Sequence, residues 1–208
     1  MSVVSNEKVF DDIYRYRKWG VGSGTGSIKY FNEPFIEFVN DFLDTHEIRT
    51  VVDIGCGDWQ IAQHLSLGDR EYIGCDVSSL ILNKTRAKFA GHKRTFLHLD
   101  ATTDVLPHGD LAIVKDVLLH LSNENIQKVL TKLDSFTYVI IQNDWGEHCE
   151  NKDIMTGSFR SIDILKKPFL ASQFQLIKKY EEGVRQPLNV LRHFVGLSPV
   201  EKAIYVRA

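Results

Sequence analysis

Short apolar runs alternate with segments of helical spacing along most of this chain, from about position 50 onward. Runs of four to seven apolar or alternating residues predict strands, and apolar positions three or four residues apart predict amphipathic helices. The runs that predict strands lie at 50–54, 72–75, 95–99, 111–115, 138–142, 175–181 and 202–207. Such alternation predicts an α/β fold with a mostly parallel, doubly wound sheet, and the last two strands are expected as an antiparallel pair.

Helices are predicted before and between these strands. A serine or threonine just ahead of an apolar periodic stretch is a typical N-cap, because its oxygen accepts from a free backbone N–H. The expected helices run over 10–18 and 31–42, begin at Trp59, run from Ser78 or Ser79 to Phe89, and begin at Ser122. Their apolar faces are expected to cover the sheet.

Composition limits the classes of protein that the chain can belong to. Its 208 residues form one ordinary domain, and a net charge of −2 with scattered Lys and Arg favours neither nucleic acid nor an acidic membrane as a partner. Three cysteines without metal-ligand spacing predict neither a disulfide framework nor a zinc site, and they fit the cytoplasm. No signal peptide or membrane-spanning run is apparent, and the sequence does not indicate an oligomeric state.

Polar residues follow the predicted strands at the edge where ligands of doubly wound sheets bind. The first strand ends in Asp53 and runs directly into a Gly-x-Gly turn, where a ligand can lie against bare backbone. An acid before such a turn disfavours phosphate and favours a cationic or amino-bearing ligand. Asp76 ends the second strand, 23 residues further on, which is the spacing of an acid that grips a ribose. The remaining strand ends carry Asp100-Ala101, Lys115-Asp116 and Asn143-Asp144.

This set of motifs resembles the class I S-adenosylmethionine-dependent methyltransferases, whose core is Rossmann-like. The resemblance implies that S-adenosylmethionine binds here and that S-adenosylhomocysteine is the product. It places Gly55 and Gly57 near the methionine part, Asp76 at the ribose and Asp100 at the adenine, with Asp53 meeting the amino group through water. The predicted cofactor set also contains Trp19, Val77, Ala101 and Lys115.

One departure from the family pattern is Trp59, which stands where many members have a third glycine. A dinucleotide dehydrogenase is the main competing interpretation. Its fingerprint requires a glycine at the sixth position of the turn, and that position is Gln60 here. The sequence also offers no convincing set of residues for hydride transfer, so methyl transfer is favoured.

The segment 19–27 contains four glycines and two serines and is predicted to be a mobile loop. No lysine of a phosphate-binding pattern follows Gly26. We expect residues 1–27 to form a helix and a lid on a core of residues 28–208, with Trp19 closing over the cofactor or the acceptor. A disordered linker is the alternative.

Candidate catalytic residues follow the fourth and fifth strands. Asp116 and His120 are four residues apart, and His120 is a candidate general base because its ordinary pKa lies near neutrality. The simpler interpretation is that His120 caps a turn and packs on the next helix. Asp144 is the third catalytic candidate.

A divalent metal such as Mg²⁺ is a second possible source of catalysis. Asp116, Asn143 and Asp144 resemble the magnesium ligands of catechol-type O-methyltransferases, although the order of the last two is reversed. Alternatively, Asn143 lines the cofactor pocket and Asp144 caps a turn. In the long segment that follows, His148 and Arg160 are candidate substrate residues together with Asn143, and Arg160 is equally compatible with a surface position.

The favoured function is O-methylation of a hydroxyl on a small molecule or a sugar or glycan, by a general base or with a metal. A protein N-methyltransferase is the alternative, followed by a module that binds the cofactor without catalysis. The stretch Lys115-Asp116-Val117-Leu118 replaces the proline-rich turn of adenine and glutamine methyltransferases, which disfavours nucleic-acid acceptors.

Overall fold

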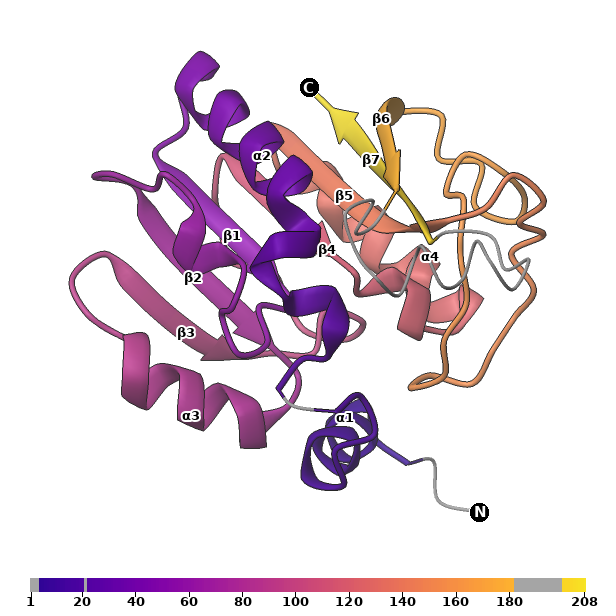
Figure 1. The fold of residues 1–208 in the computed structure, drawn as a ribbon, viewed down its shortest axis with the longest axis horizontal. Coiled ribbons are helices and arrows are strands. Elements are labelled where there is room, and N and C mark those ends of the chain that lie inside the picture. The colour runs from indigo at the N-terminus through magenta and orange to yellow at the C-terminus, as the bar shows by residue number, and fades with distance from the viewer. Residues whose placement is uncertain (1–3, 21, 182–199) are drawn as a thin grey trace.

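The computed structural model describes residues 4–20, 22–181 and 200–208 of the chain. Its centre is a seven-stranded sheet in the order β3-β2-β1-β4-β5-β7-β6 (Figure 1). The strands are β1 Thr50–Ile54, β2 Glu71–Asp76, β3 Arg94–His98, β4 Leu111–Lys115, β5 Tyr138–Trp145, β6 Gln175–Glu181 and β7 Glu201–Arg207. Strands β1 to β5 pair in parallel, while β7 is antiparallel to both β5 and β6. The predicted fold class is confirmed.

Four α-helices are described, namely α1 Asn6–Arg15, α2 Glu33–Thr45, α3 Ser79–Phe89 and α4 Asn123–Lys132. Serine side chains accept from backbone N–H groups at the start of three of them: Ser5 before α1, Ser78 before α3 and Ser122 before α4. Short 3₁₀ turns are η1 Thr25–Ser27, η2 Lys29–Asn32, η3 Ala62–His64, η4 Leu118–His120 and η5 Leu133–Ser135. Within the described ranges, none of the helices is both long and apolar enough to cross a bilayer.

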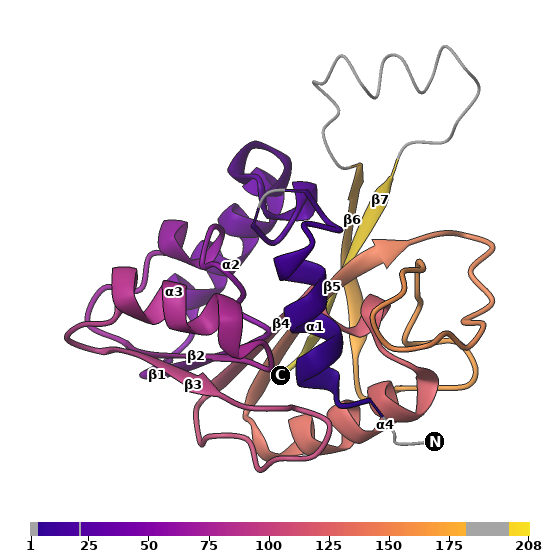
Figure 2. The ribbon, with the colours of Figure 1, turned by 90° about the horizontal axis from the view of Figure 1, so that it is seen from below.

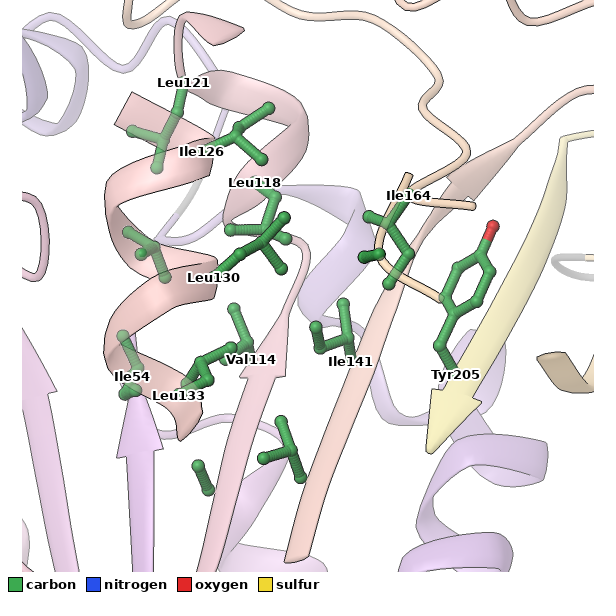
Figure 3. Close-up of a cluster of buried hydrophobic side chains, with 14 of the residues drawn as sticks. Ile54, Val114, Leu118, Leu121, Ile126, Leu130, Leu133, Ile141, Ile164 and Tyr205 are labelled. Atoms are coloured by element: carbon green, nitrogen blue, oxygen red, sulfur yellow. The ribbon is translucent and has the colours of Figure 1, made fainter. Parts of the chain in front are cut away.

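Two apolar layers hold the helices against the sheet. On one face, Ile126 and Leu130 of α4 pack over Val114 and Ile141 of the central strands (Figure 3). On the other face, the apolar side of α2 packs over the same sheet, as its periodicity predicts. Fully burying one Leu or Ile side chain contributes about 1.5–3 kcal/mol, so each layer fixes its helix firmly.

The predicted helix at Trp59 is wrong. Trp59 has a φ of +62°, a left-handed conformation that cannot continue a right-handed helix, and only the short turn η3 follows. Its ring is buried against Tyr72, Phe89 and Phe96. This residue thus adopts a backbone conformation that glycine takes without strain, and aromatic packing holds it there.

Helix α1 lies between α3 and α4 at the carboxyl end of the parallel strands (Figure 2). Asp11 accepts from the hydroxyl of Ser78 at 2.6 Å and from the backbone N–H of Leu80 at 3.1 Å. Through these contacts α1 is attached to the start of α3. The N-terminal helix therefore forms one wall of the crevice at the strand ends.

Candidate functional site

A cavity of about 550 Å³ opens at the carboxyl ends of the central strands. This volume lies within the range of about 300–1,000 Å³ that is usual for sites of small ligands. Twelve of the fifteen residues that the sequence nominated line it. They are Trp19, Asp53, Gly55, Gly57, Asp76, Val77, Asp100, Ala101, Lys115, Asp116, His120 and Asp144.

The turn after β1 and the end of β2 form the centre of this cavity. Gly55 and Gly57 have φ values of +79° and +53°, which residues with a side chain rarely adopt. The carboxylate of Asp76 accepts from the N–H groups of Gly57 at 2.9 Å and Ser78 at 2.8 Å. Burial raises the pKa of Asp76 to about 6. A carboxylate held in this way presents its remaining acceptor capacity to the cavity.

Asp53 lies deeper, at the end of β1. Its carboxylate accepts a hydrogen bond of 2.6 Å from the hydroxyl of Tyr72, and burial raises the pKa of Asp53 to about 6. The two acids therefore give the centre of the cavity an excess of acceptor groups. A ligand with a cationic or hydrogen-bond-donating part suits this region.

The far end of the cavity is formed by Asp100 and α1. Asn6 donates to Oδ2 of Asp100 at 3.0 Å, while Thr102 donates to Oδ1 through its backbone N–H at 2.9 Å and its hydroxyl at 2.7 Å. These donors fix the orientation of the carboxylate. Asn6 was not predicted as a site residue, because a single asparagine in a short helix gives no signal in the sequence.

The glycine-rich segment lies over the turn after β1. The backbone N–H of Ser23 donates to Asp58 at 3.1 Å, and the N–H of Asp58 donates to the Ser23 hydroxyl at 3.2 Å. The hydroxyls of Tyr14 and Ser23 also share a hydrogen bond of 3.1 Å. A Cβ atom on Gly57 would collide with Ser23 Oγ, so glycine is needed there for the segment to close. Val21 lies outside the described residues.

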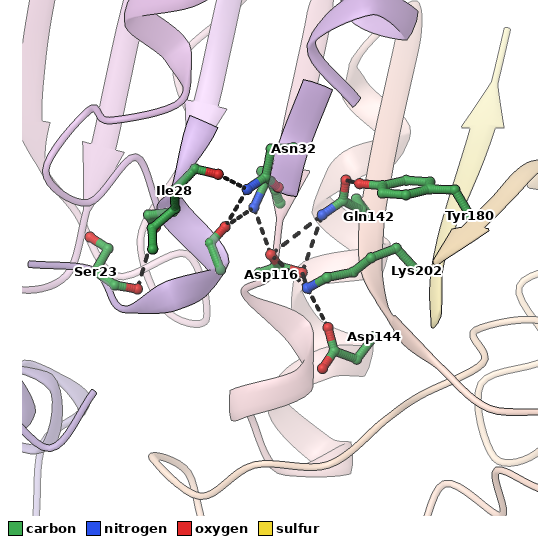
Figure 4. A network of polar contacts seen from close by, with 11 residues as sticks. Ser23, Ile28, Asn32, Asp116, Gln142, Asp144, Tyr180 and Lys202 are labelled. Carbon is green, nitrogen blue, oxygen red and sulfur yellow. Dashed lines mark hydrogen bonds and ion pairs between the residues drawn. The ribbon is translucent and has the colours of Figure 1, made fainter. Parts of the chain in front are cut away.

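An ion network lies where β4 and β5 end and β7 begins (Figure 4). Asp116, whose φ is +53°, accepts from Lys115 at 2.6 Å and from Lys202 through both carboxylate oxygens at 3.1 Å. Lys202 also forms an ion pair with Asp144. Although burial alone would raise it, the ammonium groups of Lys115 and Lys202 hold the pKa of Asp116 well below its usual range. Burial raises the pKa of Asp144.

The same network connects the sheet to the glycine-rich segment. Lys115 Nζ and Asn32 Nδ2 both donate to the carbonyl oxygen of Gly26, each at 2.9 Å. On its other side, Asp116 lies within 3.4 Å of the amide nitrogen of Gln142, whose oxygen accepts from Tyr180 at 2.6 Å. Asp116 is thus surrounded by donors, which indicates a structural anion rather than a proton acceptor.

The acids of this network do not fit a metal centre. Lys202 Nζ lies between Asp116 and Asp144, where a cation shared by these two carboxylates would have to bind. Asn143, the third expected ligand, does not line the cavity. In the part of the chain that the structure describes, no three His, Cys, Asp or Glu side chains gather as metal ligands. The charge expected from a metal is supplied here by an ammonium group.

His120 lies at the edge of the cavity with one ring nitrogen engaged. Its Nδ1 lies 2.9 Å from the carbonyl oxygen of Ser158, which can only accept, so Nδ1 carries a proton. The neutral ring then has an unprotonated Nε2, for which the described residues offer no hydrogen bond. The indole of Trp19 stacks on the imidazole with ring centroids 4.5 Å apart. Burial lowers the pKa of His120, which favours the neutral form.

Three predicted substrate residues lie elsewhere. Arg160 donates to the carbonyl of Leu121 at 2.8 Å and to the side chain of Asn123 at 2.7 Å, and it does not line the cavity. His148 is exposed and outside the cavity. Asn143 is fully buried, and its amide makes no hydrogen bond to any described residue. The expectation that these three side chains face an acceptor is therefore not supported by their positions.

The structure adds Lys202 and Phe159 to the cavity wall. Lys202 is the second residue of β7. From the sequence alone, a lone lysine at the start of a strand is expected to be exposed, so it was not predicted as a site residue. Phe159 lies in the irregular segment after β5, where no periodicity assigns a direction to any side chain. Only the topology brings these two residues to the end of β4.

A mostly parallel sheet with acids at successive strand ends defines a domain that binds a nucleoside-type cofactor at this edge. The family model described as a methyltransferase domain matches residues 51–137, which run from β1 to the residue before β5. This match and the fold support a class I S-adenosylmethionine-dependent methyltransferase, as the resemblance in the sequence implied.

Solved structures of low sequence identity share this fold. The chain is similar to magnesium protoporphyrin IX methyltransferase from Synechocystis PCC 6803 with bound SAM, at 15% identity and a TM-score of 0.66 over 100% of both chains. It is similar to the N-methyltransferase NodS from Bradyrhizobium japonicum WM9 in complex with S-adenosylhomocysteine, at 10% identity and a TM-score of 0.66 over 94% of this chain and 98% of that chain.

A third similar structure is 1,6-didemethyltoxoflavin-N1-methyltransferase from Burkholderia thailandensis, at 12% identity and a TM-score of 0.62 over 100% of this chain and 92% of that chain. No curated protein matches the sequence significantly. At these identities the similarity establishes the fold, and the acceptor has to be inferred from the residues of this chain.

Proposed function

We propose that this protein transfers a methyl group from S-adenosylmethionine to a hydroxyl of a small molecule, with His120 as the general base and without a metal. The observation that carries the proposal is the hydrogen bond between His120 Nδ1 and the Ser158 carbonyl. It leaves the basic nitrogen Nε2 for a proton of the acceptor.

The cofactor, when bound, supplies a methyl group that its sulfonium already activates. The residues of this chain fit it: Asp76 would accept from the ribose hydroxyls and Asp100 from the adenine amine, while Gly55 and Gly57 allow close approach of the methionine part. Asn6 and Thr102 would hold Asp100 in position. S-adenosylhomocysteine is the product that these contacts would then release.

The part of the cavity proposed for the acceptor is lined by Trp19, by His120 and by the network of Lys202 with Asp116 and Asp144. A hydroxyl needs its proton removed as it attacks, and a neutral imidazole with a lowered pKa can do this at neutral pH. The ammonium of Lys202 would stabilise negative charge that develops on the acceptor oxygen. Asp144 would keep that ammonium in place.

The named acceptors of the similar structures support a small-molecule acceptor. One similar protein is a protoporphyrin methyltransferase, and another was crystallised with 1,6-didemethyltoxoflavin.

We further propose a single domain, in which residues 1–27 form the helix and lid on a core of residues 28–208. All three cysteines are free, which supports a cytosolic location.

The proposal is tested with labelled donor and a panel of phenols, alcohols, sugars and peptides. Transfer to a hydroxyl is expected, with kcat falling at least about 100-fold in His120→Gln and an unchanged rate after EDTA treatment. The matched control is His148→Gln, because His148 is exposed and lies outside the cavity. Transfer only to protein nitrogen, or full activity of His120→Gln, would refute the proposed function.

A further inference from the structure

Three aromatic rings stand side by side on the acceptor side of the cavity. The indole of Trp19 stacks on the imidazole of His120 at 4.5 Å between centroids, with 30° between the planes. On the same imidazole, the ring of Phe159 lies 5.9 Å away at 51°. The three residues come from the glycine-rich segment, from η4 and from the segment after β5, and all three line the cavity. Tertiary structure alone therefore assembles this aromatic wall.

Phe159 is the member of this wall that the fold itself does not need. Its side chain is 60% exposed, although the neighbouring backbone is fixed by the contact of Ser158 with His120 and by the N–H of Arg160, which donates to Leu119 at 3.3 Å. An exposed aromatic ring at the rim of a cavity offers a large apolar surface to a ligand. Phe159 therefore has apolar surface that an acceptor in the cavity could cover.

The polar groups near these rings are largely occupied by one another. Asp116 and Asp144 are bound to lysine ammonium groups, and Lys115 and Lys202 balance the two acids in charge. Arg160 is engaged by backbone and Asn123. A sugar would need several convergent side chains with open hydrogen-bonding capacity. The lining of the cavity also includes the apolar residues Val117, Leu119 and Leu121.

On these grounds we infer that the acceptor is a flat, uncharged aromatic compound whose ring packs against Phe159 and whose hydroxyl points to Nε2 of His120. This inference rests on the proposed function and specifies its acceptor. We infer a flat acceptor because aromatic rings line this part of the cavity. We infer an uncharged acceptor because the lysine and aspartate side chains here already balance one another in charge. A phenol also has a lower pKa than an alcohol, so a weak base such as imidazole suffices.

The reaction balances without any further reactant. The acceptor loses its O–H proton to Nε2 of His120, and its oxygen forms the new bond to the methyl carbon as the bond from that carbon to sulfur breaks. The positive charge of the sulfonium is thereby replaced by the charge of the imidazolium, which returns its proton to water. The products are the aryl methyl ether and neutral S-adenosylhomocysteine.

The test measures binding and transfer separately, using protein saturated with S-adenosylhomocysteine for binding. Equilibrium dialysis compares 2-naphthol with its saturated analogue decahydro-2-naphthol and with methyl glucoside. We expect 2-naphthol to bind most tightly, and Phe159→Ala to weaken it roughly two- to tenfold, which is the effect of losing one aromatic contact. Met155→Ala is the matched control, because Met155 is 83% exposed in the same segment and does not line the cavity. It should bind 2-naphthol as the unaltered protein does.

Equal binding of 2-naphthol and its saturated analogue, no binding of 2-naphthol at millimolar concentration, or no effect of Phe159→Ala would overturn the inference. Methyl transfer to methyl glucoside that depends on His120 would also overturn it, while the proposed function would stand. Conversely, if 2-naphthol binding depends on Phe159 and its methylation persists in His120→Gln, the aromatic acceptor is supported and the base is refuted.

Discussion

Nδ1 of His120 lies 2.9 Å from the carbonyl oxygen of Ser158, a residue 38 positions further along the chain. The contact joins the end of η4 to the irregular segment after β5. It determines which ring nitrogen carries the proton, and so which one faces the cavity as a base. A second contact in the same place, from the N–H of Gly157 to the carbonyl of His120 at 2.8 Å, holds the backbone of both segments.

The first prediction concerns the pH dependence of kcat. A base must be neutral to act, and burial lowers the pKa of His120. The rate should therefore rise with pH through a pKa below the ordinary value of about 6.5 and be constant near neutrality. Steady-state rates from pH 5 to 8 measure this profile. His120→Gln should abolish the dependence with a loss of about 100-fold or more, and an unchanged profile in that variant would exclude His120 as the base.

The second prediction concerns cofactor affinity and Asp76. The pKa of Asp76 is raised to about 6 by burial, so the carboxylate becomes protonated as the pH falls below that value. A protonated carboxyl accepts poorly from ribose hydroxyls, so binding of S-adenosylhomocysteine should weaken about tenfold per unit below pH 6 and be constant above pH 7. Titration calorimetry at several pH values tests this. A dissociation constant that is the same at pH 5 and pH 7 would contradict it.

Asp76→Asn is the matched variant for this measurement. It keeps the shape of the side chain but removes the titrating charge, so it should bind more weakly at neutral pH and lose most of the pH dependence. Asp53, whose pKa is also raised to about 6, would leave a smaller residual slope. The stability of the ligand-free protein depends on pH in the opposite direction. Because the raised pKa keeps these carboxyl groups protonated in the folded protein while they ionise in the unfolded chain, the free energy of unfolding falls as pH rises from about 4 to 6.

The third prediction concerns the ion network. Replacing Lys202 by Met leaves Asp144 buried without its cation, and removing one partner of a buried ion pair costs about 3–5 kcal/mol. Urea unfolding should show this loss, and Lys202→Met/Asp144→Leu should recover part of it because both charges are then absent. Lys152→Met is a suitable control, since Lys152 is 83% exposed and its ion pair with Glu150 is screened by water, so its loss should change stability very little. Equal effects of the two lysine variants would show that the network is not important for stability.

The sheet was predictable because its strands are apolar runs separated by clear turns. Strands β1, β4 and β6 have the bounds expected from the sequence. The predicted fifth strand, 138–142, was too short, because β5 continues to Trp145. In the sequence, the polar residues Asn143 and Asp144 suggest that the strand ends before them. They stay in the strand because they pair with Ala203 and Lys202 of β7, a strand nearly 60 residues away.

The acids that line the cavity were predictable from their place after each strand, and the groups that orient them were not. Lys202 and Ser158 act through contacts with residues that are distant in sequence, and Ser158 acts through its backbone carbonyl, which every residue has. Arg160 shows the reverse case. A charged residue in a long loop suggests a ligand contact, but its guanidinium is used to hold the loop against η4 and α4.

The last prediction follows from this role of Arg160 as a positioning residue. Arg160→Met removes the hydrogen bonds to Leu121 and Asn123 and should loosen the segment that carries Ser158. We expect kcat to fall roughly 10- to 100-fold with unchanged affinity for S-adenosylhomocysteine. The pH profile of kcat should also shift, because His120 loses a fixed partner on Nδ1. Asn123→Ala removes one of the two contacts and should have a smaller effect in the same direction. If Arg160→Met raises KM for the acceptor and leaves kcat and its pH profile unchanged, Arg160 contacts the substrate, as first expected from the sequence.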